Sequence, residues 1–212
     1  MWNVFSWIAV LIAVLASQAR TLAAEPIERP LFDGKSLASW DGDPRFWRAE
    51  NGEVIGETTA AAKAEKNTFL IYRGGVFGDF DLRFQYQVRG GNSGIQYRSV
   101  EKGPWSIGGY QADFEDRHQK SNDGLIDKFT GMFFEEQGRG FMGQRGQTVL
   151  VKHNSQNARK PLLDIVGSVG DPSDLEKVID RDGWNEMRVI AHGYTFVHVV
   201  NGRVMSIAVD ED

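Results

Sequence analysis

The chain contains no cysteine among its 212 residues. Disulfides are therefore excluded, and so are thiol catalysis, cysteine-type metal sites and a lipid anchor on a cysteine. Histidine is also scarce, and none of the four residues has the spacing of a metal-binding pair; they are His118, His153, His192 and His198. His198 alternates with Phe196 and Val200, which is typical of a packed strand residue rather than a ligand.

Several motifs of common enzymes are missing as well. The sequence has no Gly-rich phosphate loop of the GxxxxGK type, no G-x-S-x-G elbow and no H-E-x-x-H segment. The net charge is −5 and no basic stripe is present, so the chain is not suited to nucleic acid or to an anionic membrane surface. Its length is enough for one sizeable domain with a hydrophobic core.

The first 24 residues differ from the rest. The run Val4–Ala16 is nearly all apolar, but it is shorter than the roughly 20 residues of a membrane-spanning helix. This length is typical of a secretion signal, with small residues after it at two candidate cleavage points. Met1–Ser6 holds no Lys or Arg, so an N-terminal membrane anchor stays as the alternative. We expect an exported protein, periplasmic or extracellular, with a signal peptide at 1–24, a single domain at 25–212, and membrane contact only through the signal segment.

Strand patterns follow almost to the end of the chain. In Phe80–Val88, apolar residues alternate strictly with polar ones, which indicates a half-buried strand. Asn201-Gly202 predicts a type I′ hairpin between the last two strands. The further predicted strands are Thr68–Tyr72, Ile95–Val100, Tyr110–Glu115, Gly131–Glu135, Thr148–His153, Leu163–Val169, Glu186–Ala191, Tyr194–Val200 and Arg203–Val209.

Evidence for helices is thin. Ser173 and Glu176 make a capping box that predicts one or two helical turns. Ala60–Lys66 has no apolar face and reads as a surface loop, and the polar stretch Arg117–Lys128 reads as a long loop. Many short strands separated by turn signals predict an all-β sandwich or barrel.

Polar residues alternate with apolar ones on two of these strands. If the strands lie side by side, one sheet face presents a shared polar set: Gln96, Arg98, Gln111, Asp113 and Glu115. Amides and carboxylates bind vicinal hydroxyls well, and an arginine adds fixed donors, so this face suits a sugar. An ordinary solvated sheet face is an equal alternative. A hard divalent cation on Asp113, Glu115 and Asp116 also stays open, and no other cofactor is indicated.

A second polar group lies further along the chain. Two carboxylates, Glu135 and Glu136, precede Arg139, which lies between two glycines. A carboxylate with such a charge partner can act as a general acid or base. A charged hairpin loop is the alternative, and spacing alone favours it. Trp105 lies in a Gly-Pro loop and is the tryptophan best placed to stack on a sugar ring.

Several segments together resemble one bacterial family. Leu31-Phe32-Asp33-Gly34-Lys35-Ser36-Leu37 with Trp40 resembles the opening of the 3-keto-disaccharide hydrolase family, also described as 3-keto-glucoside lyase/hydratase. Further segments match in the family's order: Gly78-Asp79-Phe80-Asp81-Leu82, Gly91-Asn92-Ser93-Gly94-Ile95 with Arg98, Gly109-Tyr110-Gln111-Ala112-Asp113, Gly183-Trp184-Asn185-Glu186, and Asn201-Gly202. The resemblance covers nearly all of the chain after the signal.

The resemblance implies a fold and a chemistry. The fold is a concanavalin-like jelly-roll sandwich of two antiparallel sheets. A partner oxidoreductase makes a ketone at C3 of a glucoside, a base then removes the C2 proton, the C1 oxygen leaves and water adds. The implied roles are base for Asp113 and acid for Glu136, with the keto sugar held by Asn92, Gln96 and Arg98. The remaining candidate substrate-binding residues are Gln111, Glu115, Arg139 and Trp105.

Two departures from the family qualify this transfer. Members often have Gly-Tyr-Glu-x-Gln where this chain has Gly-Tyr-Gln-Ala-Asp, which exchanges the acid and the amide at Gln111 and Asp113. Members also continue past the last hairpin, so we expect the C-terminal strands to be missing after Asp212. Two other hypotheses stay open: a non-catalytic carbohydrate-binding module of the same fold, and an interaction domain with no small ligand.

Overall fold

A computed structural model describes residues 28–116 and 128–212. Leu31–Asp212 is one compact unit and contains all the secondary structure described here. The predicted signal peptide, His118 and most of the predicted loop Arg117–Lys128 lie outside the described residues. Within the part that is described, no helix is long and apolar enough to cross a bilayer.

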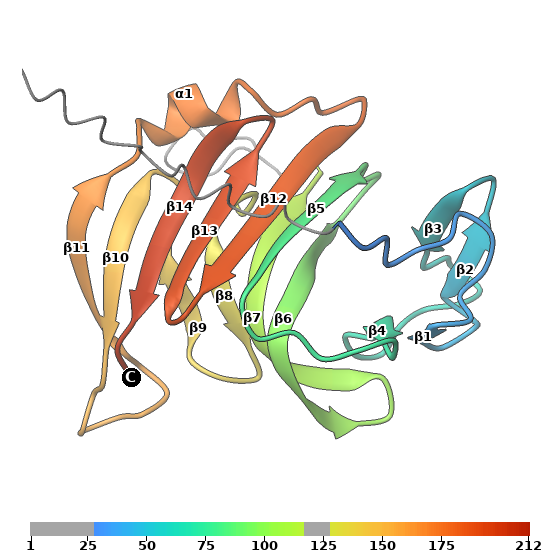
Figure 1. The fold of residues 1–212 in the computed structure, drawn as a ribbon, viewed down its shortest axis with the longest axis horizontal. Coiled ribbons are helices and arrows are strands. Elements are labelled where there is room, and N and C mark those ends of the chain that lie inside the picture. The colour runs from blue at the N-terminus through green and yellow to red at the C-terminus, as the bar shows by residue number, and fades with distance from the viewer. Residues whose placement is uncertain (1–27, 117–127) are drawn as a thin grey trace, which may run out of the picture. The chain divides into compact units, whose positions relative to one another are not determined.

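The larger sheet has six strands in the order β11-β10-β14-β13-β12-β5. Their bounds are β5 Phe80–Tyr86, β10 Gln147–Lys152, β11 Leu162–Ser168, β12 Asn185–His192, β13 Thr195–Val200 and β14 Arg203–Asp210. All neighbours pair antiparallel except β10 and β14, which are parallel. The last strand, β14, lies inside the sheet, because β10 and β13 flank it (Figure 1).

The smaller sheet has four strands in the order β6-β7-β8-β9, all antiparallel. Their bounds are β6 Asn92–Gly103, β7 Ser106–Glu115, β8 Phe133–Glu136 and β9 Gly140–Gly143. Two short two-stranded sheets precede them, one pairing β1 Trp40–Asp41 with β4 Ile71–Tyr72 and the other pairing β2 Trp47–Glu50 with β3 Glu53–Gly56.

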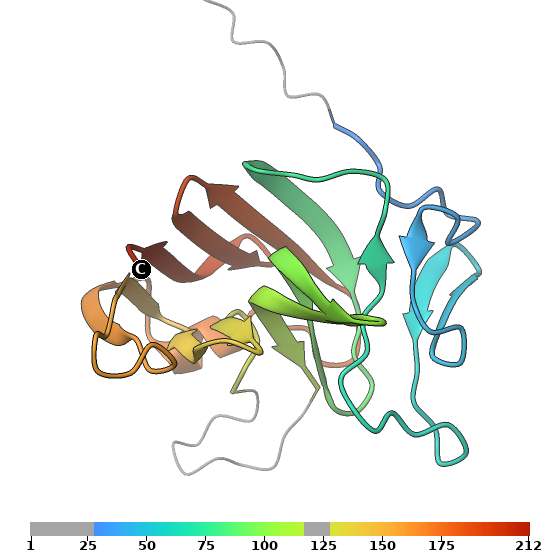
Figure 2. The same cartoon turned by 90° about the horizontal axis from the view of Figure 1, so that it is seen from below.

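The two main sheets stack face to face and enclose the core (Figures 1 and 2). Buried side chains of both sheets meet there, including Tyr97 and Phe133 from the smaller sheet and Phe196 and Met205 from the larger. Alternation explains this layering, since every second residue of a strand points to the same face. The predicted all-β jelly-roll sandwich is confirmed, with the parallel pair as the one departure from purely antiparallel sheets.

Local predictions differ in their outcome. The Asn201-Gly202 turn is confirmed, with φ of 48° and 75° at its two residues. The short helix α1 Pro172–Glu176 is present, but the predicted cap is wrong: Asp171 is the N-cap and accepts a hydrogen bond from the backbone N–H of Ser173. Proline at the first helical position explains the shift, because its ring presets the helical φ and needs no donor partner.

His198 is confirmed as a packed strand residue. Its side chain lies between the sheets with 1% of the residue exposed. Nε2 lies 2.9 Å from the hydroxyl of Tyr97, and Nδ1 lies 3.1 Å from the backbone oxygen of Met132. Desolvation in this position lowers the pKa of His198 to about 4, although hydrogen bonds to Gly131 and Met132 act in the opposite direction. His198 therefore links the two sheets as a neutral ring.

Candidate functional site

One row of side chains crosses all four strands of the smaller sheet. Gln96 pairs with Gln111, Gln111 with Phe134, and Phe134 with Phe141. Their neighbours Tyr97, Ala112 and Phe133 are buried in the core, so by alternation the row points to the opposite, outer face. The two polar strands therefore lie side by side, which is the condition for a shared polar face. The row places two amides beside two aromatic rings.

A chain of hydrogen bonds links the amides to a carboxylate. Nε2 of Gln96 donates to Oε1 of Gln111, and Nε2 of Gln111 donates to Oδ1 of Asp113. Asp113 is 3% exposed. Within the described residues, Oε1 of Gln96 is buried and accepts no hydrogen bond. The carboxylate of Asp113 therefore fixes the orientation of both amides. At the other end of this series of hydrogen bonds, Oε1 of Gln96 is left as an acceptor.

Gly94 makes this arrangement fit. It lies opposite Asp113 in the β6–β7 pair and has no side chain. A Cβ at Gly94 would stand 2.6 Å from Cγ of Gln111, closer than real contacts allow. The side chain of Gln111 thus lies across the space that Gly94 leaves open.

Glu136 shares the outer face with Asp113. It pairs with Gly109 on β7, four residues before Asp113, so roughly 13 Å of strand separates the two positions. This spacing leaves room for one sugar ring between the two side chains. Glu136 is only partly buried, and the amide of Asn67 lies 3.3 Å from each of its carboxylate oxygens.

Glu115 and Asn92 are paired at the far end of the same face. Glu115 is 5% exposed, and its Oε1 accepts hydrogen bonds from the backbone N–H of Lys128 at 2.6 Å and of Phe129 at 3.0 Å. Its carboxylate anchors the chain where it returns toward β8. Asn92 is exposed.

Asp113, Glu115 and Asp116 are the candidate ligands of a divalent cation. All three carboxylates already accept hydrogen bonds, from Gln111, from backbone N–H groups and, for Asp116, from the backbone N–H of Gly90 at 2.6 Å. Across 28–116 and 128–212, no three His, Asp or Glu side chains stand together in a metal-binding arrangement.

Arg98 does not join the outer face, contrary to its predicted place. The register shifts between Tyr97 and Val100, and Arg98 itself has a φ of 46°. A bulge of this kind turns the side chain away from the alternating pattern. The guanidinium instead bonds Oδ1 of Asp79 at 2.9 Å and lies 5.3 Å from the ring centroid of Phe196. This contact joins β6 of the smaller sheet to the segment just before β5 of the larger sheet.

Arg139 pairs with Glu135, one of the two carboxylates beside it in the sequence, and also with a carboxylate of the other sheet. It forms ion pairs with Glu135 at 2.6 Å and with Asp210 at 2.5 Å, and Asp210 accepts the hydroxyl of Tyr110 at 2.7 Å. Burial by itself would raise the pKa of Asp210, but the hydrogen bonds from Arg139 and Tyr110 outweigh it and lower that pKa. This cluster ties β8 to β14. The guanidinium of Arg139 is thus held by Glu135 and Asp210 rather than by Glu136.

Trp105 lies in the turn between β6 and β7, and its indole is engaged by another segment of the chain. It has a φ of 47° in the β6–β7 turn, and its indole Nε1 donates to Oδ1 of Asp41 at 2.7 Å. Its backbone oxygen accepts the N–H of Phe69 at 3.0 Å. Trp105 therefore joins the β6–β7 hairpin to the segments around β1 and β4.

Two phenylalanines, Phe134 and Phe141, lie in the row on the outer face. Phe141 is 47% exposed, its ring stands edge-on to Phe134 at 4.9 Å between centroids, and it stacks on Phe129 at 5.3 Å. The four-residue strand β9 was missed because two of its residues are glycines. Without β9, the sequence held no sign that Phe134 and Phe141 are neighbours.

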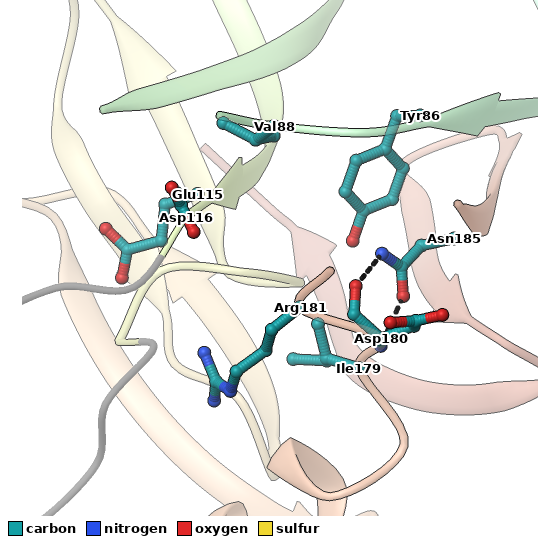
Figure 3. A pocket seen from close by; sticks show the side chains of 8 residues that line it. All are labelled: Tyr86, Val88, Glu115, Asp116, Ile179, Asp180, Arg181 and Asn185. Carbon is teal, nitrogen blue, oxygen red and sulfur yellow. Dashed lines mark hydrogen bonds between the residues drawn. The ribbon is translucent and has the colours of Figure 1, made fainter. Parts of the chain in front are cut away.

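A separate small pocket lies at one end of the sandwich (Figure 3). Its lining residues are Tyr86, Val88, Glu115, Asp116, Ile179, Asp180, Arg181 and Asn185. The amide of Asn185 bonds the backbone of Asp180 in both directions, at 2.8 Å and 2.7 Å. The space open to solvent is about 10 Å³, the room of a single water molecule, so this pocket is too small for a sugar.

The outer face of this β-sandwich presents amides, carboxylates and aromatic rings, groups that can bind a carbohydrate. The chain belongs to the family of 3-keto-alpha-glucoside-1,2-lyase-like domains, whose model matches residues 28–212. No curated protein matches it. Among solved structures it is similar to a candidate glycosyl hydrolase from Parabacteroides distasonis, with 18% identity, a TM-score of 0.48, and coverage of 84% of this chain and 70% of that one. Membership of this family assigns to the chain a glycoside-hydrolase-like function on carbohydrates.

Proposed function

We propose that this protein cleaves 3-keto-glycosides by abstraction of the C2 proton, elimination of the C1 oxygen and hydration. The observation that carries the proposal is the outer face of the smaller sheet, along which Asp113, the amides of Gln96 and Gln111, and Glu136 all lie. Family membership supports the substrate class. The two carboxylates supply a base and an acid, and the amides supply donors for the ketone oxygen.

The proposed reaction proceeds in three steps. Asp113 takes the proton from C2, and the electron pair moves to the C3 oxygen as an enolate, which the amide N–H groups stabilise. The C1–O bond then breaks as the ketone re-forms, and Glu136 protonates the leaving oxygen. Water finally adds across the C1–C2 double bond, with its hydroxyl on C1 and its proton on C2.

The low exposure of Asp113 adds one requirement. Its Oδ1 accepts the amide of Gln111, so the base is occupied until that amide finds another acceptor. The ketone oxygen of the substrate is such an acceptor. In the proposal, binding of the sugar therefore moves the Gln111 amide onto the ketone and releases Asp113 for the proton.

The test is proton NMR in deuterated water with a 3-keto-glucoside. We expect the unmodified protein to remove the C2 proton signal and to release the aglycone. Asp113→Asn should abolish both, whereas Glu136→Gln should slow the release more than the exchange. Asp164→Asn, an exposed carboxylate on β11, is the control and should keep both rates. Undiminished exchange by Asp113→Asn would refute the assignment of the base.

A binding module is the second candidate, and the 3% exposure of Asp113 favours it. It predicts sugar binding without C2 exchange in any variant, so the same experiment separates the two. Because the substrate ketone has to be made by oxidation at C3, the proposal includes a glycoside C3-oxidoreductase in the same pathway. It also includes export through the segment 1–24, which would place the reaction in the periplasm or outside the cell.

A further inference from the structure

Phe141 is an exposed ring held in a fixed orientation. It is 47% exposed although it is braced on two sides, by Phe134 edge-on at 4.9 Å and by Phe129 stacked at 5.3 Å with an interplanar angle of 12°. Burying a phenylalanine is favourable and leaving it in water forgoes that gain. A rigid exposed ring at the end of a polar row is therefore suited to stack on a ligand.

The register places these rings relative to the proposed chemistry. Phe134 precedes Glu136 by two residues on β8 and points to the same face, so about 7 Å of strand separates them. Phe141 lies two strands from Gln111 along the same row, or roughly 10 Å. Gln96 and Gln111 occupy the other half of the row. A ligand along the row would meet amides at one end and aromatic rings at the other.

We propose that Phe141, braced by Phe129 and Phe134, is a stacking platform for the leaving group of the glycoside. This inference rests on the proposed function for the orientation of the ligand. Glu136, which protonates the leaving oxygen in that function, stands beside the aromatic half of the row, whereas the amides hold the oxidised ring. The leaving group therefore lies over Phe134 and Phe141.

The platform defines a substrate class. A phenylalanine face attracts a flat or apolar ring face and offers no hydrogen-bond partner to a small alkyl group. The leaving group should thus carry a ring, and two sources fit: a second pyranose, as in a disaccharide, or an aromatic aglycone. Glycosides with methyl leaving groups lack any contact with Phe141.

Calorimetry with unoxidised glucosides of one anomer tests the platform without turnover. The ligands are a methyl glucoside, a phenyl glucoside and a glucosyl-glucose disaccharide. We expect one or both ring-bearing ligands to bind the unmodified protein about tenfold more tightly than the methyl glucoside. The one that gains identifies the source of the ring. Phe141→Ala should remove the gain and leave the affinity for the methyl glucoside unchanged.

Two further variants keep the result interpretable. Phe141→Leu preserves apolar volume without an aromatic face, so a result shared with Phe141→Ala is not a simple folding defect. This variant should also lose the tighter binding of the ring-bearing ligands. Phe77→Ala removes another phenylalanine, 40% exposed and stacked on Tyr72 away from the row, and should keep it. Equal affinities of the unmodified protein for all three ligands, or absence of binding, would overturn the platform, and so would a gain that survives in both Phe141 variants. A gain that depends on Phe141 in a protein without C2 exchange would support the platform and refute only the enzymatic function.

Discussion

His198 makes the stability of this protein depend on pH in a defined window. The ring is 1% exposed between the two sheets, and burial lowers the pKa of His198 from 6.5 to about 4. Above pH 6.5 the ring is neutral in both the folded and the unfolded chain, so its contribution is fully present. Between pH 6.5 and about 4 the unfolded chain binds a proton that the folded chain rejects, and stability is lost. Below about 4 the loss levels off.

The magnitude follows from the shift. Each unit of pKa difference corresponds to about 1.4 kcal/mol, so the full window costs about 3 kcal/mol of unfolding free energy. A comparison of pH 7 with pH 5 covers only part of the range between pH 6.5 and about 4. Between pH 7 and pH 5 the expected loss from His198 is about 2 kcal/mol, which is a large part of the 5–15 kcal/mol typical of a domain.

Denaturant unfolding at pH 7 and pH 5 measures this loss against a variant. His198→Asn removes the titrating ring, and although it is less stable at both pH values, its fall between them should be smaller by about 2 kcal/mol. His192→Asn, at an exposed histidine, is the control and should fall by nearly as much as the unmodified protein. If the unmodified protein and His198→Asn fall equally, His198 accepts a proton in the folded state and the argument from its burial is wrong.

Two more substitutions test the site and the fold. Gly94→Ala places a Cβ 2.6 Å from Cγ of Gln111, so we expect about 1–3 kcal/mol of destabilisation in thermal unfolding. Sugar binding measured by calorimetry should weaken at least about tenfold. Unchanged binding would show that Gln111 is not held as described. Asp210→Asn leaves Arg139 without its buried partner and should lower the unfolding free energy by about 3 kcal/mol in denaturant. The affinity for sugar should be retained. A loss of affinity at full stability would instead place Arg139 in the site.

Much of the outer face could be predicted from the sequence. The alternation in the two polar strands was enough to put Gln96, Gln111 and Asp113 on one face, because the side-chain period of a strand is a local property. The turn Asn201-Gly202 was equally readable, since positive φ is needed at both positions and these residues adopt it at low cost.

Arg98 and Arg139 show where that reasoning stops. Alternation put Arg98 beside Gln96, but one bulge reversed its side chain, and a bulge depends on how the whole strand packs against its partners. Arg139 follows Glu136 by only three residues in the chain, yet it pairs with Asp210, 71 residues away in the other sheet. The distance along the chain held no information about that pair.

The sequence by itself determined the class of fold, most of the strands, the last hairpin and the residues that could face a sugar. These features follow from the period of two in a strand, from the φ preferences of turn residues and from burial of apolar side chains. The tertiary structure alone decided which of these residues share a row. The order of the strands brought Phe134 and Phe141 into one row with Gln111, and packing of the sheets paired Arg98 with Asp79 and Arg139 with Asp210. Such pairings join distant segments, and they are set by the packing of two complete sheets rather than by any local pattern.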